Sequence, residues 1–357
     1  MKNESIFLHA LPRTSSTYVF EKLRRPAYDT YCYNEPHHEI HATLTREQAK
    51  KGSSATWPAG HHPPDFAPYY FEYLPLLQES GGTLAYKREY GVANFFPSGP
   101  LSEGEIAYLR LLEENARKRN LRPVYGFCHS FGRVGHIRKA FTGVHVVQYR
   151  NPHQVLASLM KLCGEGFFCS AVKEAKPGSL LDRIGFAGPD ILHAELDPVP
   201  ESLALVTSPA LYALFFEFYV IGVIAGAFYA DLLLSVDLLA HDTDYRAAFT
   251  RDFEKLTGIA VNFADAKLPD KHEGAIYNPT FFEDAIEKYA GSEERLKVFK
   301  NALEAVSGTP VCKSIQDIQE MIEIWKTIFP SSKCADDLIL CIIIFKFSFG
   351  EIGVHLP

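Results

Sequence analysis

A short apolar segment, a hydroxyl-rich loop and an amphipathic helix follow one another in residues 5–25, SIFLHALPRTSSTYVFEKLRR. This order constrains the fold more than any other feature of the chain. The apolar run Ile6–Leu11 is short enough to be a buried strand. The helical pattern that follows puts Val19, Phe20 and Leu23 on one face and charged residues on the other. A strand that leads through a compact loop into a helix aims backbone N–H groups at the positive end of the helix dipole.

The loop itself adds donors for an anion. Arg13 brings a fixed positive charge, and hydroxyl groups come from Thr14, Ser15, Ser16 and Thr17. The segment therefore predicts a phosphate or sulfate site. The simpler alternative is an ordinary strand–helix turn in which Ser15 or Ser16 caps the helix. Because the loop lacks the glycines and the Gly-Lys-Ser/Thr ending of a Walker A loop, ATP hydrolysis is not the first expectation.

Strand-like and helix-like patterns alternate along much of the chain. Further strands are expected at Ala27–Cys32, Thr83–Tyr90, Pro123–Cys128, Val144–Tyr149 and 232–236. Helical patterns occur near Arg46–Lys51, at Tyr69–Gln78, 103–119, Phe131–Phe141, from Pro152, at 208–230 and at Tyr245–Leu256, where Gly258 ends the helix. This alternation predicts an α/β fold with a doubly wound parallel sheet flanked by helices.

The expected domain organisation is one α/β domain over residues 1–330, followed by an unassigned extension at 331–357. Within the α/β domain, the Gly- and Pro-rich residues 164–207 are predicted to form a long excursion over the carboxyl edge of the sheet, where ligands bind in such folds. A helical C-terminal part completes the domain, with helical patterns at Phe281–Ala290, Glu293–Val306 and Ile315–Phe329.

A second potential anion site follows the strand Val144–Tyr149. Arg150 comes at the carboxyl end of this strand, Pro152 begins the next helix, and Ser158 lies about two turns into that helix. Both side chains can reach one phosphate beside the first turns of the helix, and the guanidinium offers a fork of donors suited to an oxyanion. Either residue alone is better explained as a surface arginine or a neutral helix serine.

Together the two segments resemble the PAPS-dependent sulfotransferases, which have a P-loop-like fold. The loop Arg13–Thr17 is similar to their 5′-phosphosulfate loop, with Ser15 or Ser16 in place of the usual glycine. Arg150, Pro152 and Ser158 keep the spacing of their 3′-phosphate motif. The segments Val236-Asp237-Leu238-Leu239 and Leu256-Thr257-Gly258-Ile259 resemble later family segments. The resemblance covers residues 5–40 and 123–265.

The resemblance implies sulfuryl transfer from PAPS to a hydroxyl or amine of a small-molecule or carbohydrate acceptor. Arg13, Thr14, Ser15, Ser16 and Thr17 would bind the 5′-phosphosulfate, and Arg150 and Ser158 the 3′-phosphate. Arg13 would also stabilise charge on the leaving oxygen, so that no metal is required.

A general base must take the proton of the acceptor. Glu35, in Tyr-Asn-Glu-Pro, stands where several carbohydrate and tyrosyl-protein sulfotransferases have a catalytic Glu. His129, in Phe-Cys-His, partly matches the catalytic His of the cytosolic enzymes. Glu89 is a weaker third candidate. We favour Glu35, followed by His129.

Two other classes of function remain open. A P-loop-like small-molecule kinase would share a strand–loop–helix phosphate site. A non-catalytic nucleotide-binding module would keep the pocket and lack the base.

Composition narrows the partners. The net charge of −7 argues against general nucleic-acid binding. The seven cysteines are odd in number and scattered, which favours a reducing compartment and predicts a cytoplasmic protein. No signal peptide is expected, since the first strand follows Met1 almost at once.

Residues 211–234 are long and apolar enough to raise the question of a membrane span. Glu217 and Asp231 interrupt them, so a buried helix followed by a central strand is the better prediction.

A histidine-rich segment and an aromatic cluster suggest an acceptor pocket. The histidines are expected to line that pocket or to be exposed rather than to bind a metal, and they are His37, His38, His41, His61 and His62. The aromatic residues either stack on an acceptor or belong to the core, and they are Phe66, Tyr69, Tyr70, Phe71 and Tyr73.

Overall fold

The computed structural model describes residues 4–51, 68–162, 166–184, 214–215, 218–219, 221–223, 226 and 229–267. Five parallel strands form its sheet, in the order β2-β3-β1-β4-β5. They are β1 (Ser5–His9), β2 (Thr30–Asn34), β3 (Arg122–Phe127), β4 (Gly143–Tyr149) and β5 (Leu232–Ser235). The parallel sheet confirms the predicted α/β class.

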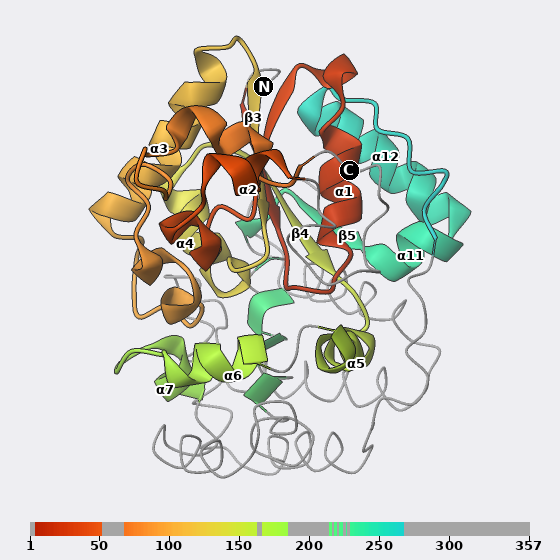
Figure 1. Cartoon of the computed structure of the whole chain (residues 1–357). Coiled ribbons are helices and arrows are strands. Elements are labelled where there is room, and N and C mark those ends of the chain that lie inside the picture. Colours follow the sequence, from red (N-terminus) through yellow and green to blue (C-terminus); the bar gives the residue numbers. More distant parts are fainter. Residues whose placement is uncertain are drawn as a thin grey trace, which may run out of the picture.

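Helices cover both faces of the sheet (Figure 1). On one face, α1 (Ser16–Leu23) and α12 (Thr243–Thr257) pack against side chains such as Ile6 and Leu8. On the other, α3 (Glu103–Arg117) and α4 (Val134–Ala140) pack against a set that includes Phe7. The alternation of Ile6, Phe7 and Leu8 between two cores follows from the two-residue period of a strand that is buried on both faces.

Close contact between α1 and the sheet depends on Gly126 of β3. A Cβ atom at this position would lie 2.6 Å from Cδ2 of Phe20, which is closer than real Cβ contacts allow. The glycine therefore lets α1 lie directly over β3, and this fixes the loop that precedes α1.

Two helices end or begin where the sequence predicts. Gly258 has φ 72° and ends α12 in the left-handed conformation that favours glycine. The turn near Arg46–Lys51 is the helix α2 (Arg46–Lys50), which begins with a capping box between Thr45 and Gln48.

Two predicted strands are wrong in whole or in part. Thr83–Tyr90 has only a single bridge, between Thr83 and Leu77, and then a 3₁₀ helix at Arg88–Tyr90, because Ala85 has φ 62° and breaks the extended chain. The strand expected at Ala27–Cys32 begins at Thr30, since Pro26 starts a 3₁₀ turn at Pro26–Tyr28.

Other predicted elements differ in type or place. Tyr69–Gln78 is a 3₁₀ helix over Phe71–Leu76 that includes Pro75, and Phe131–Phe141 is a 3₁₀ turn (Phe131–Arg133) that continues into α4. The helical residues between 214 and 229 are followed by β5 as expected, but β5 is the outer strand of the described sheet and not a central one. No helix in the described ranges is long and apolar enough to span a bilayer.

The described part of the excursion 164–207 contains α6 (Gly166–Lys173) and α7 (Leu180–Ile184). Figure 1 shows both, together with α5 (Pro152–Leu162), beyond the end of the sheet toward which β4 points. The predicted helices at 281–290, 293–306 and 315–329 and the extension 331–357 lie outside the described residues.

Candidate functional site

The loop between β1 and α1 contains two residues in the left-handed conformation. Arg13 has φ 75° and Ser15 has φ 57°. Thr14 is buried between them, and its hydroxyl donates to the Leu11 carbonyl at 2.8 Å, which closes the turn. Ser15, and not Ser16, therefore takes the conformation that a glycine would adopt freely.

The first turn of α1 is not capped in the usual way. Ser15 is the N-cap residue, but its side chain makes no capping hydrogen bond. The hydroxyl of Ser16 instead lies 3.2 Å from the sulfur of Cys128, which follows β3. The capping alternative is wrong for Ser15, and the positive end of the helix faces the loop without a side-chain acceptor from that residue.

Arg13, Ser158 and Arg150 meet at one place although they come from three elements. Nε of Arg13 donates to Oγ of Ser158 in α5 at 2.9 Å. Nη1 of Arg150, at the end of β4, lies 3.5 Å from the Arg13 carbonyl oxygen. Arg150 is 4% exposed and Ser158 is 1% exposed. The structure thus brings Arg13 of the predicted 5′ site together with the predicted 3′ residues Arg150 and Ser158.

The backbone of Arg150 is held on both sides. Its N–H donates to the hydroxyl of Tyr219 at 2.8 Å, and that hydroxyl donates back to the Arg150 carbonyl. Asp237, near the start of α11 (Val236–His241), accepts the Asn151 N–H at 2.7 Å and lies 3.6 Å from Nε of Arg150. These contacts fix the place from which the guanidinium extends.

The Arg150 guanidinium is a buried cation with an unsatisfied donor. Its Nε is buried and pairs with Asp237 at 3.6 Å, but it makes no hydrogen bond to any other group in the described part of the chain. Burial lowers the pKa of Arg150, whereas the nearby Asp237 carboxylate raises it. The positive charge of Arg13 lowers this pKa further, because the two guanidinium groups repel each other. Two neighbouring guanidinium groups that share only one carboxylate among the described residues, that of Asp237, are features of a site that an anion could complete.

The sheet topology explains why these residues converge. The connection after β1 leads to β2 on one side of the sheet, whereas the connection after β4 leads to β5 on the other side. Adjacent parallel strands whose connections leave in opposite directions create a crevice at their carboxyl ends, and ligands bind there in open α/β sheets.

Glu35 lies at the carboxyl end of β2 in a left-handed conformation, with φ 45°. Such a backbone costs a residue with a side chain about 1–2 kcal/mol, and it persists where the surroundings impose it. The Glu35 N–H donates to the Gly126 carbonyl at 2.7 Å, and Oε2 lies 3.5 Å from the Tyr70 hydroxyl. The carboxylate also raises the pKa of the buried Cys128 thiol, second to burial itself, so Glu35, Cys128 and Ser16 are neighbours.

His129 lies beside Glu35 in a defined protonation state. Its Nδ1 is 3.3 Å from the His37 carbonyl oxygen, which can only accept, so Nδ1 carries the proton and Nε2 the lone pair. Burial, and then His38, lower the pKa of His129 to about 3, while Glu35 acts in the opposite direction. His129 is therefore neutral at physiological pH, with a lone pair on Nε2, but burial makes it a weak base.

His38 links the two candidate bases. Its ring stacks on that of His129 at a centroid distance of 5.6 Å, and its Nε2 lies 3.8 Å from Oε2 of Glu35. The third candidate, Glu89, does not join this group by any contact in the described structure. Its side chain is 52% exposed and faces Lys87 at 3.9 Å.

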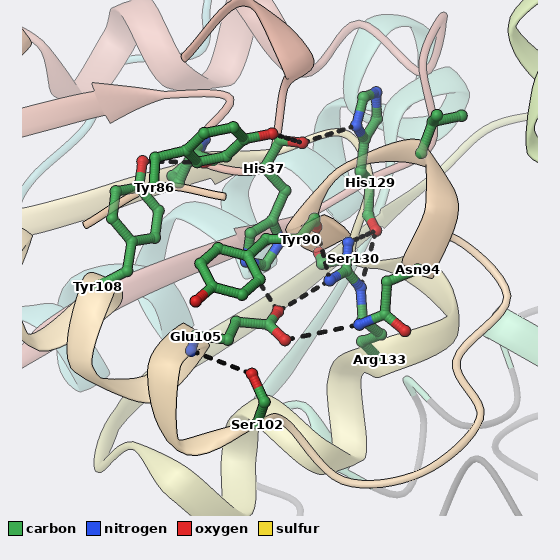
Figure 2. Close-up of polar contacts among 12 residues, drawn as sticks. His37, Tyr86, Tyr90, Asn94, Ser102, Glu105, Tyr108, His129, Ser130 and Arg133 are labelled. Atoms are coloured by element: carbon green, nitrogen blue, oxygen red, sulfur yellow. Dashed lines mark hydrogen bonds and ion pairs between the residues drawn. The ribbon is translucent and has the colours of Figure 1, made fainter. Parts of the chain in front are cut away.

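A buried ionic network supports this side of the site (Figure 2). Arg133 is fully buried, and its Nη1 lies 2.8 Å from Oε1 of Glu105, which is 3.2 Å from Nε2 of His37. Arg133 also donates to the His129 carbonyl through Nε at 3.2 Å and Nη2 at 2.8 Å. Burial alone would raise the pKa of Glu105, but Arg133 and His37 together hold it below its ordinary value. The network therefore fixes the backbone of His129.

The histidines and aromatic residues of the sequence prediction have separate roles. His37 and His41 are buried rather than exposed, and His61, His62 and Phe66 lie outside the described residues. Tyr69, Tyr70 and Tyr73 belong to the core, whereas Phe71 is half exposed. In the described ranges no three His, Cys, Asp or Glu side chains are grouped as metal ligands.

Sequence reasoning missed Arg133 and Glu105. The helix around Arg133 has the pattern of a basic surface helix, and nothing local shows that this residue is buried. The one available signal is Ser102-x-x-Glu105, a helix start in which Glu105 is followed by an apolar helix face.

No protein-family model matches the chain, and searches of curated proteins and of solved structures found no significant match.

Proposed function

We propose that this protein is a sulfotransferase of the P-loop-like fold, which moves a sulfuryl group from PAPS to a hydroxyl or amine of a small-molecule or carbohydrate acceptor. The observation that carries the proposal is the convergence of Arg13 and Arg150, which are 137 positions apart, at the topological switch point of the sheet. A cytoplasmic location agrees with the three described cysteines being free thiols.

The residues present fit a nucleotide with two phosphate groups. Among the contacts of the described structure, the buried Nε of Arg150 makes no hydrogen bond and only an ion pair with Asp237 at 3.6 Å, and the Arg13 side chain uses only its Nε, on Ser158. In the proposed complex, Arg13, Ser15, Ser16 and Thr17 bind the 5′-phosphosulfate together with the helix N-terminus, and Thr14, whose hydroxyl donates to the Leu11 carbonyl, holds the turn in shape. Arg150 and Ser158 bind the 3′-phosphate.

The proposed chemistry divides between two sides of the site. PAPS, when bound, supplies the sulfuryl group. Arg13 stabilises the negative charge that develops on the leaving oxygen, because a fixed cation there needs no reorganisation during the reaction. On the other side, Glu35 takes the proton of the acceptor hydroxyl or amine, and His129, with its lone pair on Nε2, is the second candidate for that role.

The first experiment measures nucleotide binding by calorimetry. We expect adenosine 3′,5′-bisphosphate to bind more tightly than ATP with Mg²⁺. Arg13→Gln should weaken bisphosphate binding by about 10- to 150-fold, since a hydrogen bond to a charged group contributes about 1.5–3 kcal/mol. Arg25→Gln is the matched control, because Arg25 is exposed and its loss changes the net charge equally.

Three results would overturn the proposal in different ways. Tighter binding of ATP with Mg²⁺ would favour the small-molecule kinase. Tight bisphosphate binding without turnover on 4-nitrophenol, tyramine or chitotriose would favour the non-catalytic module. Equal effects of Arg13→Gln and Arg25→Gln would remove Arg13 from the site.

A further inference from the structure

The backbone of Glu35 is held by hydrogen bonds from three directions. Its N–H donates to the Gly126 carbonyl, and its carbonyl accepts from the His38 N–H at 2.9 Å and from Nε2 of His41 at 3.1 Å. The His38 bond closes a local turn. The His41 bond is different, because it comes from a buried side chain whose own position is fixed elsewhere.

His41 is fixed as a neutral donor. The Glu35 carbonyl can only accept, so Nε2 carries the proton, and Nδ1 accepts from the hydroxyl of Thr83 at 3.0 Å. His41 and Thr83 are both buried. Burial lowers the pKa of His41 to about 3, so this arrangement is unchanged throughout the neutral range.

Aromatic rings enclose the imidazole and connect it to the other end of Glu35. Tyr73 packs on His41 at a centroid distance of 4.1 Å, and Tyr70 meets it edge-on at 5.3 Å. The hydroxyl of Tyr70 lies 3.5 Å from Oε2 of Glu35. One packed unit therefore contacts both the backbone carbonyl and the carboxylate of the same residue.

We propose that His41 is a positioning residue that, with Thr83 behind it, holds Glu35 in the left-handed conformation from which its carboxylate reaches the acceptor. This inference rests on the proposed function, in which Glu35 is the general base. A left-handed residue with a side chain persists only where its surroundings impose it, and a displaced base loses most of its effect.

The test compares His41→Phe, which keeps a ring but loses the donor, with His41→Gln, whose amide nitrogen restores one. With PAPS and tyramine or chitotriose, we expect His41→Phe to lower kcat by about 10- to 100-fold and His41→Gln to recover most of that loss. The dissociation constant of adenosine 3′,5′-bisphosphate should stay unchanged in both. If His41→Phe does not fold, Thr83→Val, a smaller change that replaces the hydroxyl with a methyl group, should also lower kcat.

The choice of acceptor separates a positioning role of His41 from a purely structural one, because only the positioning role makes the loss of kcat depend on whether the acceptor needs a base. 4-Nitrophenol is largely ionised at pH 8 and needs no base, so the loss in His41→Phe should shrink with this acceptor. If His41→Phe lost the same factor in kcat with ionised and un-ionised acceptors, or had the same kcat as His41→Gln, the positioning role of His41 would be overturned and the proposed function would not be affected. Absence of wild-type turnover with every acceptor would overturn the proposed function and this inference with it.

Discussion

Replacing Glu105 by Gln tests the buried network that supports His129. The change keeps the shape of the side chain and removes its charge, so that the fully buried Arg133 has no counter-ion. Breaking a buried ion pair from one side costs about 3–5 kcal/mol, because an uncompensated charge stays buried. We expect a loss near the lower end, about 3 kcal/mol, since the amide oxygen can still accept from Nη1 and the bonds to the carbonyls of Tyr90 and His129 remain.

The free energy of unfolding is measured by urea titration with circular dichroism at pH 7.5. Glu47→Gln is the matched control, since it makes the same chemical change in an exposed pair with Lys51 and should have no measurable effect. The double variant Glu105→Gln/Arg133→Met removes the stranded charge. It should be more stable than Glu105→Gln by about 1 kcal/mol or more, within the coupling expected for residues in one network.

Two outcomes would refute this account. If Glu105→Gln were as stable as Glu47→Gln, the Glu105–Arg133 pair would contribute nothing to the free energy of unfolding. A double variant less stable than Glu105→Gln would mean that Arg133 stabilises the fold through its carbonyl contacts and not through its charge.

The remaining predictions concern turnover and pH. Glu35→Gln should lower kcat by about 100- to 10,000-fold and leave bisphosphate binding nearly intact, and unchanged turnover would reject Glu35 as the base. Acid should destabilise the fold, because burial lowers the pKa of His37 and His136 to about 4 and of His41 and His145 to about 3. Their folded values lie below the unfolded value, so this stability is present above about pH 6.5 and is lost as the pH falls. As the pH falls from about 6.5 to about 5.5, each of these histidines should lower the free energy of unfolding by about 1 kcal/mol. Equal free energies of unfolding at the two pH values would contradict the effect of burial on the histidine pKa values.

The places of most strands, and of Arg13 and Arg150 after two of them, could be predicted because local patterns specify them. Ile6–Leu11 is a largely apolar run, interrupted by His9 and followed by a polar loop, and Arg150 directly follows the largely apolar Val144–Tyr149, so the carboxyl end of each strand can be located in the sequence. Parallel pairing then places both ends at one edge. Their convergence follows from the order of the strands, which no local pattern encodes.

The supporting contacts could not be predicted because they depend on tertiary packing. His41 and Thr83 are 42 positions apart, and Thr83 lies in a segment that has the composition of a strand. The segment turns away at Ala85, where the left-handed backbone is imposed by packing and not by residue type. Arg133 likewise has the helical spacing of a surface residue, and only the position of Glu105 on another helix explains its burial.

The strand β1, which precedes the loop Arg13–Thr17, has a neighbouring strand on each side. β1 has β3 on one side and β4 on the other, whereas β2 and β5 are the outer strands of the described sheet. Because sheet edges open more readily than central strands, thermal fraying would reach the anchor of Glu35 on β2 well before that of Arg13. Under the proposed function, nucleotide binding should therefore persist to a higher temperature than turnover, with a warm range in which PAPS still binds but its sulfuryl group is no longer transferred.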